Sequence, residues 1–206
     1  MNASKDSGVQ EEMIVTFQGY RNLFLLRMEF RCLKPRKWIN SSIINWKMKE
    51  MNNSNLPRFT KEFYCVESGI LDTILNERNL IAYETKGEYI GMNPNLGLDK
   101  ENFDKEKAAT RQWWLIPICH RHHWYLYAFN IVKKELLVLD SLFDHAFDDK
   151  RRLVDIYVGK IVEDMLNIVI PTYHHTETGF QCCYTKVSKQ PKNDDCGICV
   201  INLMES

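Results

Sequence analysis

The sequence has no excess of either charge, because 27 Lys and Arg side chains balance 27 Asp and Glu side chains. Proteins that bind nucleic acid electrostatically usually carry a clear basic excess, so we expect no nucleic-acid partner. The sequence also lacks a stretch of the roughly 18 apolar residues that a membrane-spanning helix needs, and we predict no membrane segment. Its start lacks the basic region and the following apolar region that mark a signal peptide.

The sequence does contain enough apolar side chains for one globular domain. Of its 206 residues, 45% are hydrophobic and 12% are aromatic, a composition that excludes an intrinsically disordered chain. It has seven cysteines, an odd number, and no visible signal peptide, which together indicate free thiols in a reducing compartment. We therefore predict an intracellular protein of the nucleus, the cytoplasm or both.

Helical patterns flank a group of consecutive strands. The hydrophobic spacing predicts a helix of about ten residues after Asn40, further helical segments at 66–80, 150–168 and 196–204, and strands at 112–119, 122–131, 135–140 and 181–187. Residues 87–108 are rich in Gly, Asn, Lys and Glu, which is typical of a surface insertion. Helices, then a small sheet, then helices predict an α+β fold.

Three residues in the second half could form a catalytic group. His123 lies at the start of one predicted strand, and Asp140 closes the next strand, 17 residues later. In a hairpin of these strands, Asp140 would lie opposite a residue between His123 and Tyr127, about 5 Å away. A carboxylate that binds one imidazole nitrogen would leave the other nitrogen facing a nucleophile.

Cys196 is the candidate nucleophile because it lies at the start of a predicted helix. The free amides of a helix N-terminus and a nearby imidazolium both favour the thiolate, which is the reactive form of cysteine. Gly197 leaves space beside the thiol. The Cys196 amide and the side chain of Gln190, six residues earlier, could donate hydrogen bonds to an oxyanion.

The combination resembles the ubiquitin-like-protein-specific cysteine proteases, the SUMO-deconjugating family related to the adenovirus protease. The matching segments are Leu115-Ile-Pro-Ile, His123-Trp124-Tyr-Leu, Val138-Leu-Asp140-Ser141, Gln190-Pro and Asp195-Cys196-Gly197, with a tryptophan-led start at Trp38-Ile39-Asn40. The resemblance implies a papain-like or adenain-like fold with a small central mixed sheet flanked by helices. Residues 31–206 would form the catalytic domain, and residues 1–30 a partly ordered N-terminal extension.

The resemblance also implies roles for individual residues. Cys196 would be the nucleophile, His123 the general base and acid, Asp140 the residue that orients His123, and Gln190 part of the oxyanion hole. Trp124 and Trp38 would line a narrow tunnel for the Gly-Gly tail of a SUMO-type ubiquitin-like protein, which the enzyme would release from conjugates or mature from its precursor. No cofactor or metal is implied, and we expect a monomer.

The sequence departs from the family pattern in three places. Ser41 stands where relatives usually have an acidic residue, and the insertion at 81–110 is longer than usual. Relatives continue beyond the nucleophile's helix, so we expect this chain to lack C-terminal elements of the domain. An alternative function is therefore a catalytically impaired module that still binds a ubiquitin-like protein.

Two other readings concern the cysteines. Zinc could bind Cys196 and Cys199 with ligands from His120, His122, His174, His175, Cys182 and Cys183. His174 and His175 are adjacent in the sequence, as are Cys182 and Cys183. Adjacent residues of a strand point to opposite faces, so such pairs suit a tetrahedral site poorly. Cys196 and Cys199 could also form a thioredoxin-like redox pair, but the expected βαβ context is absent around them.

Overall fold

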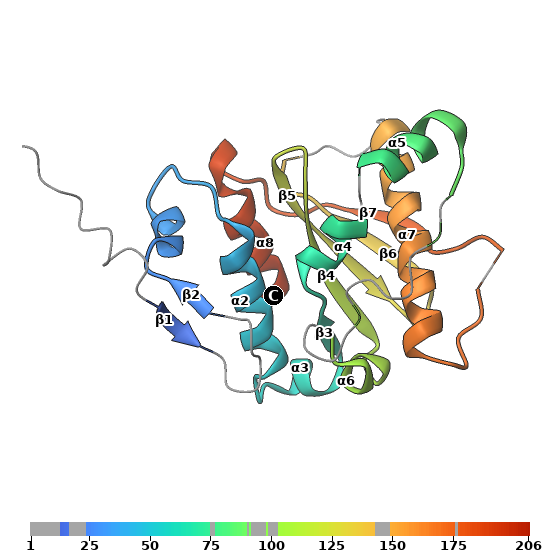
Figure 1. Ribbon diagram of the computed structural model, residues 1–206, viewed down its shortest axis with the longest axis horizontal. Helices are drawn as coiled ribbons and strands as arrows, with labels where there is room; N and C mark the ends of the chain where they lie inside the picture. Colours follow the sequence, from blue (N-terminus) through green and yellow to red (C-terminus); the bar gives the residue numbers. More distant parts are fainter. Residues whose placement is uncertain are drawn as a thin grey trace, which may run out of the picture.

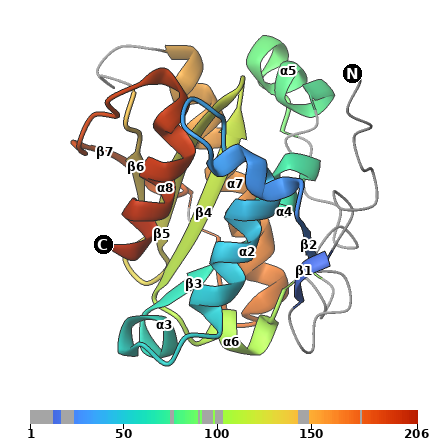
Figure 2. The ribbon, with the colours of Figure 1, turned by 90° about the vertical axis from the view of Figure 1, so that its left-hand side faces the viewer.

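The computed structural model shows a five-stranded sheet between two layers of helices (Figure 1). It describes residues 13–16, 24–74, 77–89, 91, 98, 103–142, 149–175 and 177–206. Helices α2 (Ser41–Asn52) and α8 (Cys196–Glu205) cover one face of the sheet, and α7 (Asp149–Val169) covers the other. Figure 2 shows α2 and α8 in front of the sheet with α7 behind it. The predicted α+β fold with a central mixed sheet is confirmed.

The sheet has the strand order β3-β4-β5-β6-β7. Its strands are β3 (Phe63–Cys65), β4 (Trp113–His120), β5 (His123–Asn130), β6 (Glu135–Leu139) and β7 (Gln181–Thr185). The three central strands form antiparallel hairpins, and the two outer strands pair in parallel with their neighbours. The central hairpins and β7 lie where the sequence predicts strands, whereas β3 is not predicted, because three residues show no readable alternation.

Both faces of β5 are buried, and the alternation of its side chains divides the core in two. Trp124, Leu126 and Ala128 pack with the α2 and α8 side chains. Tyr125 and Tyr127, from the alternate positions, pack with α7 on the opposite face. This period of two is what a strand requires. The site residues on β5 therefore reach both helical layers.

Local sequence explains the helix that begins the predicted catalytic domain. The Asn40 side chain accepts a hydrogen bond of 3.0 Å from the Ile43 amide and so caps α2. Ile44, Met48 and Met51 recur at helical spacing and are all buried. The predicted helix after Asn40 is confirmed.

The segment between α2 and β4 differs from the prediction. Residues 66–80 contribute to two helices rather than one. The helices of this region are α3 (Pro57–Lys61), α4 (Ser68–Ile74), α5 (Glu77–Lys86) and α6 (Lys105–Ala109). The predicted surface insertion at 87–108 also supplies core residues, since Leu98 and Phe103 are buried. The ring of Phe103 lies 5.5 Å from that of Trp114. The prediction missed this contact because single apolar residues in a polar segment show no periodicity.

A short N-terminal hairpin packs beside α2. It consists of β1 (Met13–Thr16) and β2 (Phe24–Leu26), followed by a 3₁₀ turn at Glu29–Leu33. Leu25 is fully buried in the core that α2 and α8 share. None of the helices among the described residues is long and apolar enough to span a membrane.

Candidate active site

The β4–β5 hairpin places His123 at the edge of the sheet. Arg121 and His122 form the two-residue turn, and both have positive φ angles, of 50° and 61°. Such a turn matches the twist of the strands that it joins, and it makes His123 the first residue of β5. His123 lies on the same side of β5 as Tyr125, and their ring centroids are 6.0 Å apart.

Asp140 comes directly after β6 and reaches His123 from the neighbouring strand. Leu126 pairs with Leu139, so the register brings Asp140 opposite Tyr125, within the predicted range. Its Oδ1 lies 2.7 Å from Nε2 of His123. The structure therefore brings together two of the residues that the sequence singles out.

Asp140 is completely buried and held on both oxygens. Oδ1 also accepts a hydrogen bond of 2.9 Å from the Leu142 amide, and Oδ2 one of 3.1 Å from Nη1 of Arg151. Burial alone would raise the pKa of this carboxyl group. The hydrogen bonds from His123 and Leu142 and the charges of His123 and Arg151 outweigh it and lower the pKa to about 2.

Cys196 begins α8 and is fully buried beside His123. Burial would raise the pKa of its thiol. Hydrogen bonds from His123, the Trp124 backbone and the Trp38 indole, together with the charge of His123, lower the pKa below its ordinary value of 9.0. These contacts favour a thiolate in the position that the sequence predicts for the nucleophile.

His123 links the carboxylate to the thiol. Burial lowers the pKa of its imidazole, but hydrogen bonds and charge interactions with Asp140 and Cys196 raise it to about 9. Because Nε2 faces Asp140, the other ring nitrogen is the one available to the thiol. A thiolate, an imidazolium and an orienting carboxylate in one hydrogen-bonded series can carry out acyl transfer.

Gln190 is bonded to Ser141, the residue that follows Asp140, and its side chain is held at both ends. Its Oε1 accepts a hydrogen bond of 2.8 Å from the Ser141 hydroxyl, and its Nε2 donates one of 2.8 Å to the Lys192 carbonyl. The backbone amide of Gln190 also donates to the Ser141 carbonyl. Since Ser141 directly follows Asp140, these bonds join the Gln190 loop to the end of β6.

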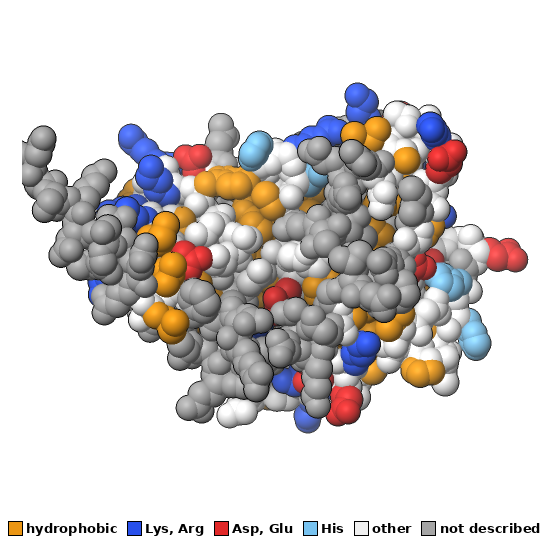
Figure 3. Space-filling view, viewed as in Figure 1, with side chains coloured by type: hydrophobic (Ala, Val, Ile, Leu, Met, Phe, Trp, Pro, Cys, Tyr) orange, Lys and Arg blue, Asp and Glu red, His pale blue; other side chains and the backbone are white. Residues whose placement is uncertain are grey.

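Trp38 and Trp124 pack against each other near Cys196. Their ring centroids are 6.5 Å apart, and the Trp124 indole donates a hydrogen bond of 2.9 Å to the Ile39 carbonyl. Trp124 is buried, whereas Trp38 is partly exposed and lies 5.9 Å from the ring of His122. Figure 3 shows hydrophobic side chains and a histidine together on the surface above α8 and β5. The structure thus brings both predicted tryptophans to the thiol.

Gly197 permits α8 to approach the segment before α2. A Cβ atom at this position would lie only 2.6 Å from Cβ of Ile39. The backbone of Ile39 holds the Trp124 indole, so the close approach ties the start of α8 to both tryptophans.

The part of the chain that the structure describes contains no group of three or more His, Cys, Asp or Glu side chains that could hold a metal ion. All seven cysteines are free thiols.

Arg151 is a charged residue of the site that the sequence does not reveal. It lies in the first turn of α7, outside the motifs that carry the resemblance. Its side chain is only 11% exposed and contacts Asp140 and Asp155. A basic residue at the start of an amphipathic helix is typical of a solvated face, and no motif distinguishes this one.

Comparison with known proteins agrees with the geometry. Residues 37–206 match the model of the Ulp1 protease family, C-terminal catalytic domain. The chain belongs to the Ulp1 protease family. It is 27% identical over 209 residues to ubiquitin-like-specific protease 1 of Saccharomyces cerevisiae, and the match covers 97% of this chain but only 29% of that protein. This chain therefore spans less than a third of that relative.

Solved structures of Ulp1-type proteases share the fold. The C-terminal Ulp1 protease domain in complex with Smt3, the yeast orthologue of SUMO, is 21% identical, with a TM-score of 0.63 over 100% of this chain and 84% of that one. The SUMO protease Ulp1 with its catalytic cysteine oxidised to a sulfinic acid is 22% identical, with a TM-score of 0.59 over 88% and 71% of the chains. The Ulp1-like SUMO protease catalytic domain of Chaetomium thermophilum is 18% identical, with a TM-score of 0.55 over 86% and 65%.

Proposed function

We propose that this chain is a cysteine peptidase domain that cleaves after the C-terminal Gly-Gly of a SUMO-type ubiquitin-like protein. The observation that carries the proposal is the hydrogen-bonded series of Asp140, His123 and Cys196. Membership of the Ulp1 protease family and the Smt3 complex of a relative support the choice of substrate.

In the proposed reaction, the Cys196 thiolate attacks the carbonyl carbon of the terminal glycine. The Cys196 amide and Gln190 stabilise the resulting oxyanion. His123 then donates its proton to the leaving amine, and a thioester forms between the modifier and Cys196. Water hydrolyses the thioester with His123 as the base, while Asp140 keeps the imidazole oriented throughout.

The tryptophans provide a reason for the Gly-Gly requirement. We propose that Trp124 and Trp38 form the walls of the path by which the substrate tail reaches Cys196. Flat indole rings leave room for a glycine backbone and exclude a residue with a side chain. The hydrogen bond from Trp124 to the Ile39 carbonyl would hold one of these walls in place.

A cleavage assay with a SUMO precursor that extends beyond Gly-Gly tests the proposal. The wild-type chain should release the extension, Cys196→Ser and His123→Ala should abolish turnover, and Asp140→Asn should lower it. Cys199→Ser is the matched control, because Cys199 is a thiol one turn later on the same helix, and it should keep turnover. Wild-type cleavage by His123→Ala would refute the mechanism.

The same assay distinguishes the peptidase from the alternative function, a module that only binds a ubiquitin-like protein. A chain that binds the SUMO precursor with the wild-type sequence, yet leaves it intact, would be a binding module rather than a peptidase. We also propose that the protein acts in the nucleus or the cytoplasm, where reducing conditions would keep its seven free cysteines as thiols.

A further inference from the structure

Arg151 lies directly behind the candidate catalytic series. Its Nη1 is 3.1 Å from Oδ2 of Asp140, and its Nε is 2.9 Å from Oδ1 of Asp155, one helical turn later on α7. Both carboxylates are fully buried, and the Arg151 side chain is 11% exposed. A buried guanidinium between two carboxylates is compensated in charge, and its planar shape allows it to bind both at once.

Asp155 is itself fixed by the sheet. The Tyr127 hydroxyl, from β5, donates a hydrogen bond to its Oδ1, and the Tyr184 hydroxyl, from β7, donates one of 2.9 Å to its Oδ2. Asp155 therefore cannot turn away from Arg151 without breaking bonds to two strands. The orientation of Arg151 is thereby set by groups outside the candidate catalytic series.

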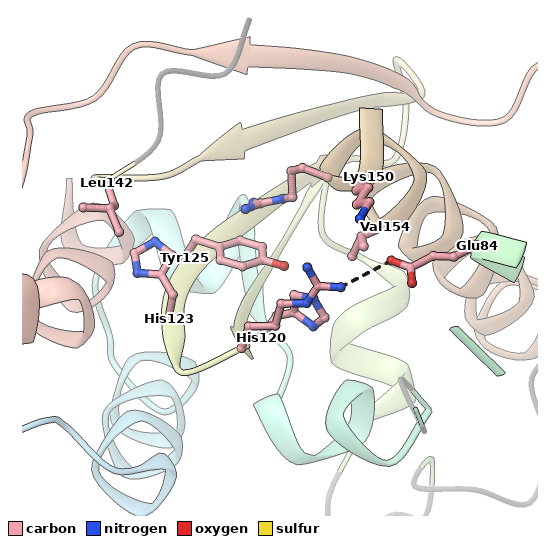
Figure 4. Close-up of a pocket in the computed structure, with 9 residues that line it drawn as sticks. Glu84, His120, His123, Tyr125, Leu142, Lys150 and Val154 are labelled. Carbon is pink, nitrogen blue, oxygen red and sulfur yellow. Dashed lines mark ion pairs between the residues drawn. The ribbon is translucent and has the colours of Figure 1, made fainter. Parts of the chain in front are cut away.

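The aromatic ring of Tyr125 packs against the guanidinium group of Arg151. The guanidinium carbon lies 3.6 Å from the centre of the Tyr125 ring, a close cation–π contact. Figure 4 shows His123 and Tyr125 on one side of a pocket, with Lys150 and Val154 of α7 on another side. The side chain of Arg151 also lines this pocket.

We propose that Arg151 is a positioning residue for the candidate active site, which fixes the Asp140 carboxylate in the orientation that binds His123. The proposal rests on the proposed function in one respect, the identity of the reaction that Asp140 and His123 serve. Asp140 uses Oδ1 for His123 and Leu142, so Oδ2 is the atom by which Arg151 prevents rotation of the carboxylate. Through Asp155, α7 and two strands then contribute to the geometry of the thiol–imidazole pair.

The pocket offers a way to test this role chemically. It has a volume of about 160 Å³ and reaches the Arg151 side chain from solvent. In Arg151→Ala, a free guanidinium ion could enter through it and occupy the place of the missing group between Asp140 and Asp155. A purely structural role of the long side chain would not be restored by so small a cation.

The readout is the rate at which iodoacetamide alkylates Cys196 at pH 7, measured by mass spectrometry of the Cys196 peptide. It requires no modifier protein, so a failure of this proposal is distinguishable from a failure of the proposed function. We expect Arg151→Ala to slow alkylation about tenfold, because a rise of one unit in the pKa of the thiol reduces the thiolate about tenfold. Guanidinium chloride at a concentration too low to unfold the protein should restore at least half of the lost rate, and equal sodium chloride should not.

Two further variants make the outcome decisive. Arg152→Ala removes the neighbouring exposed arginine of α7 and should alkylate at the wild-type rate. Arg151→Lys keeps the charge and tests the case in which the alanine variant does not fold. We expect it to be at least threefold slower than wild type, since an ammonium group lacks the planar fork that serves two carboxylates. A wild-type rate in folded Arg151→Ala or Arg151→Lys, or a loss that guanidinium does not restore in folded Arg151→Ala, would overturn the proposal.

Discussion

Nε2 of His123 lies 2.7 Å from Oδ1 of the buried Asp140, and this contact joins the start of one strand to the end of the next. The hairpin register sets it, because β5 and β6 run antiparallel with Leu126 opposite Leu139. The consequence is an imidazole whose second nitrogen is left for Cys196, the first residue of α8.

The reactivity of Cys196 should depend on pH through this pair. The pKa of the thiol is lowered below 9.0, so the thiolate forms at a lower pH than in an isolated cysteine. His123→Ala removes the hydrogen bond and the charge that lower the pKa of the Cys196 thiol. The pH at which the alkylation rate rises should therefore be higher in this variant. The pKa values of Cys65 and Cys182, about 12 and about 11, predict that neither reacts readily at pH 7. Peptide mass spectrometry after iodoacetamide treatment measures all three thiols, and an unchanged profile in His123→Ala would contradict the assignment.

Asp140 should make a contribution to the stability of the fold that depends on pH. Its pKa is about 2 in the folded protein against about 3.9 in an unfolded chain, so its ionised form favours folding above pH 4. This contribution, on the order of 2 kcal/mol, should decrease as the pH falls from about 4 to about 2. Asp140→Asn should therefore be less stable than wild type at pH 7 and should show a weaker loss of stability over this acid range. Urea unfolding at several pH values measures the difference, and parallel curves for the two proteins would be inconsistent with the buried ion pairs.

Gly197→Ala should disturb the site through packing. The added Cβ would meet Ile39 at 2.6 Å, and relief of this overlap must move α8 or the segment that holds Trp124. Overpacking of this kind costs about 1–3 kcal/mol, and turnover should fall with it. Gly69→Ala is the control, since its added Cβ meets nothing within 4 Å beyond its chain neighbours and its own helix backbone, and it should change stability by no more than about 1 kcal/mol. Thermal unfolding of both variants tests this, and equal effects would show that the Ile39 contact is unimportant.

Gln190→Ala should lower kcat more than it changes KM. Loss of one oxyanion donor typically reduces kcat by about 10²–10³-fold. Ser141→Ala removes the hydroxyl that binds Oε1 of Gln190 and should have a smaller effect in the same direction. Lys186→Ala, an exposed change on the same loop, should leave kcat unaltered. Steady-state kinetics with a SUMO precursor measure these values, and a wild-type kcat in Gln190→Ala would remove this residue from the proposed mechanism.

Much of the site could be predicted from the sequence because its parts depend on local rules. Strand alternation and hairpin length bring Asp140 to His123, and a helix start identifies Cys196. The contribution of α7 could not be predicted in this way. The burial of Arg151 depends on how α7 packs across the sheet, and its partner Asp155 reads as one more polar residue of an amphipathic helix. The contact of Gly197 with Ile39 depends likewise on packing between segments about 160 residues apart.

The most direct test of the account is covalent labelling by SUMO that carries an electrophile in place of its terminal carboxylate. We predict a single adduct with the mass of one SUMO molecule, mapped by mass spectrometry to Cys196 and absent in Cys196→Ala. Cys199→Ser should label as wild type does. Labelling that persists in Cys196→Ala, or a folded wild-type chain that never labels, would contradict the claim that Cys196 is the nucleophile of a SUMO-type peptidase.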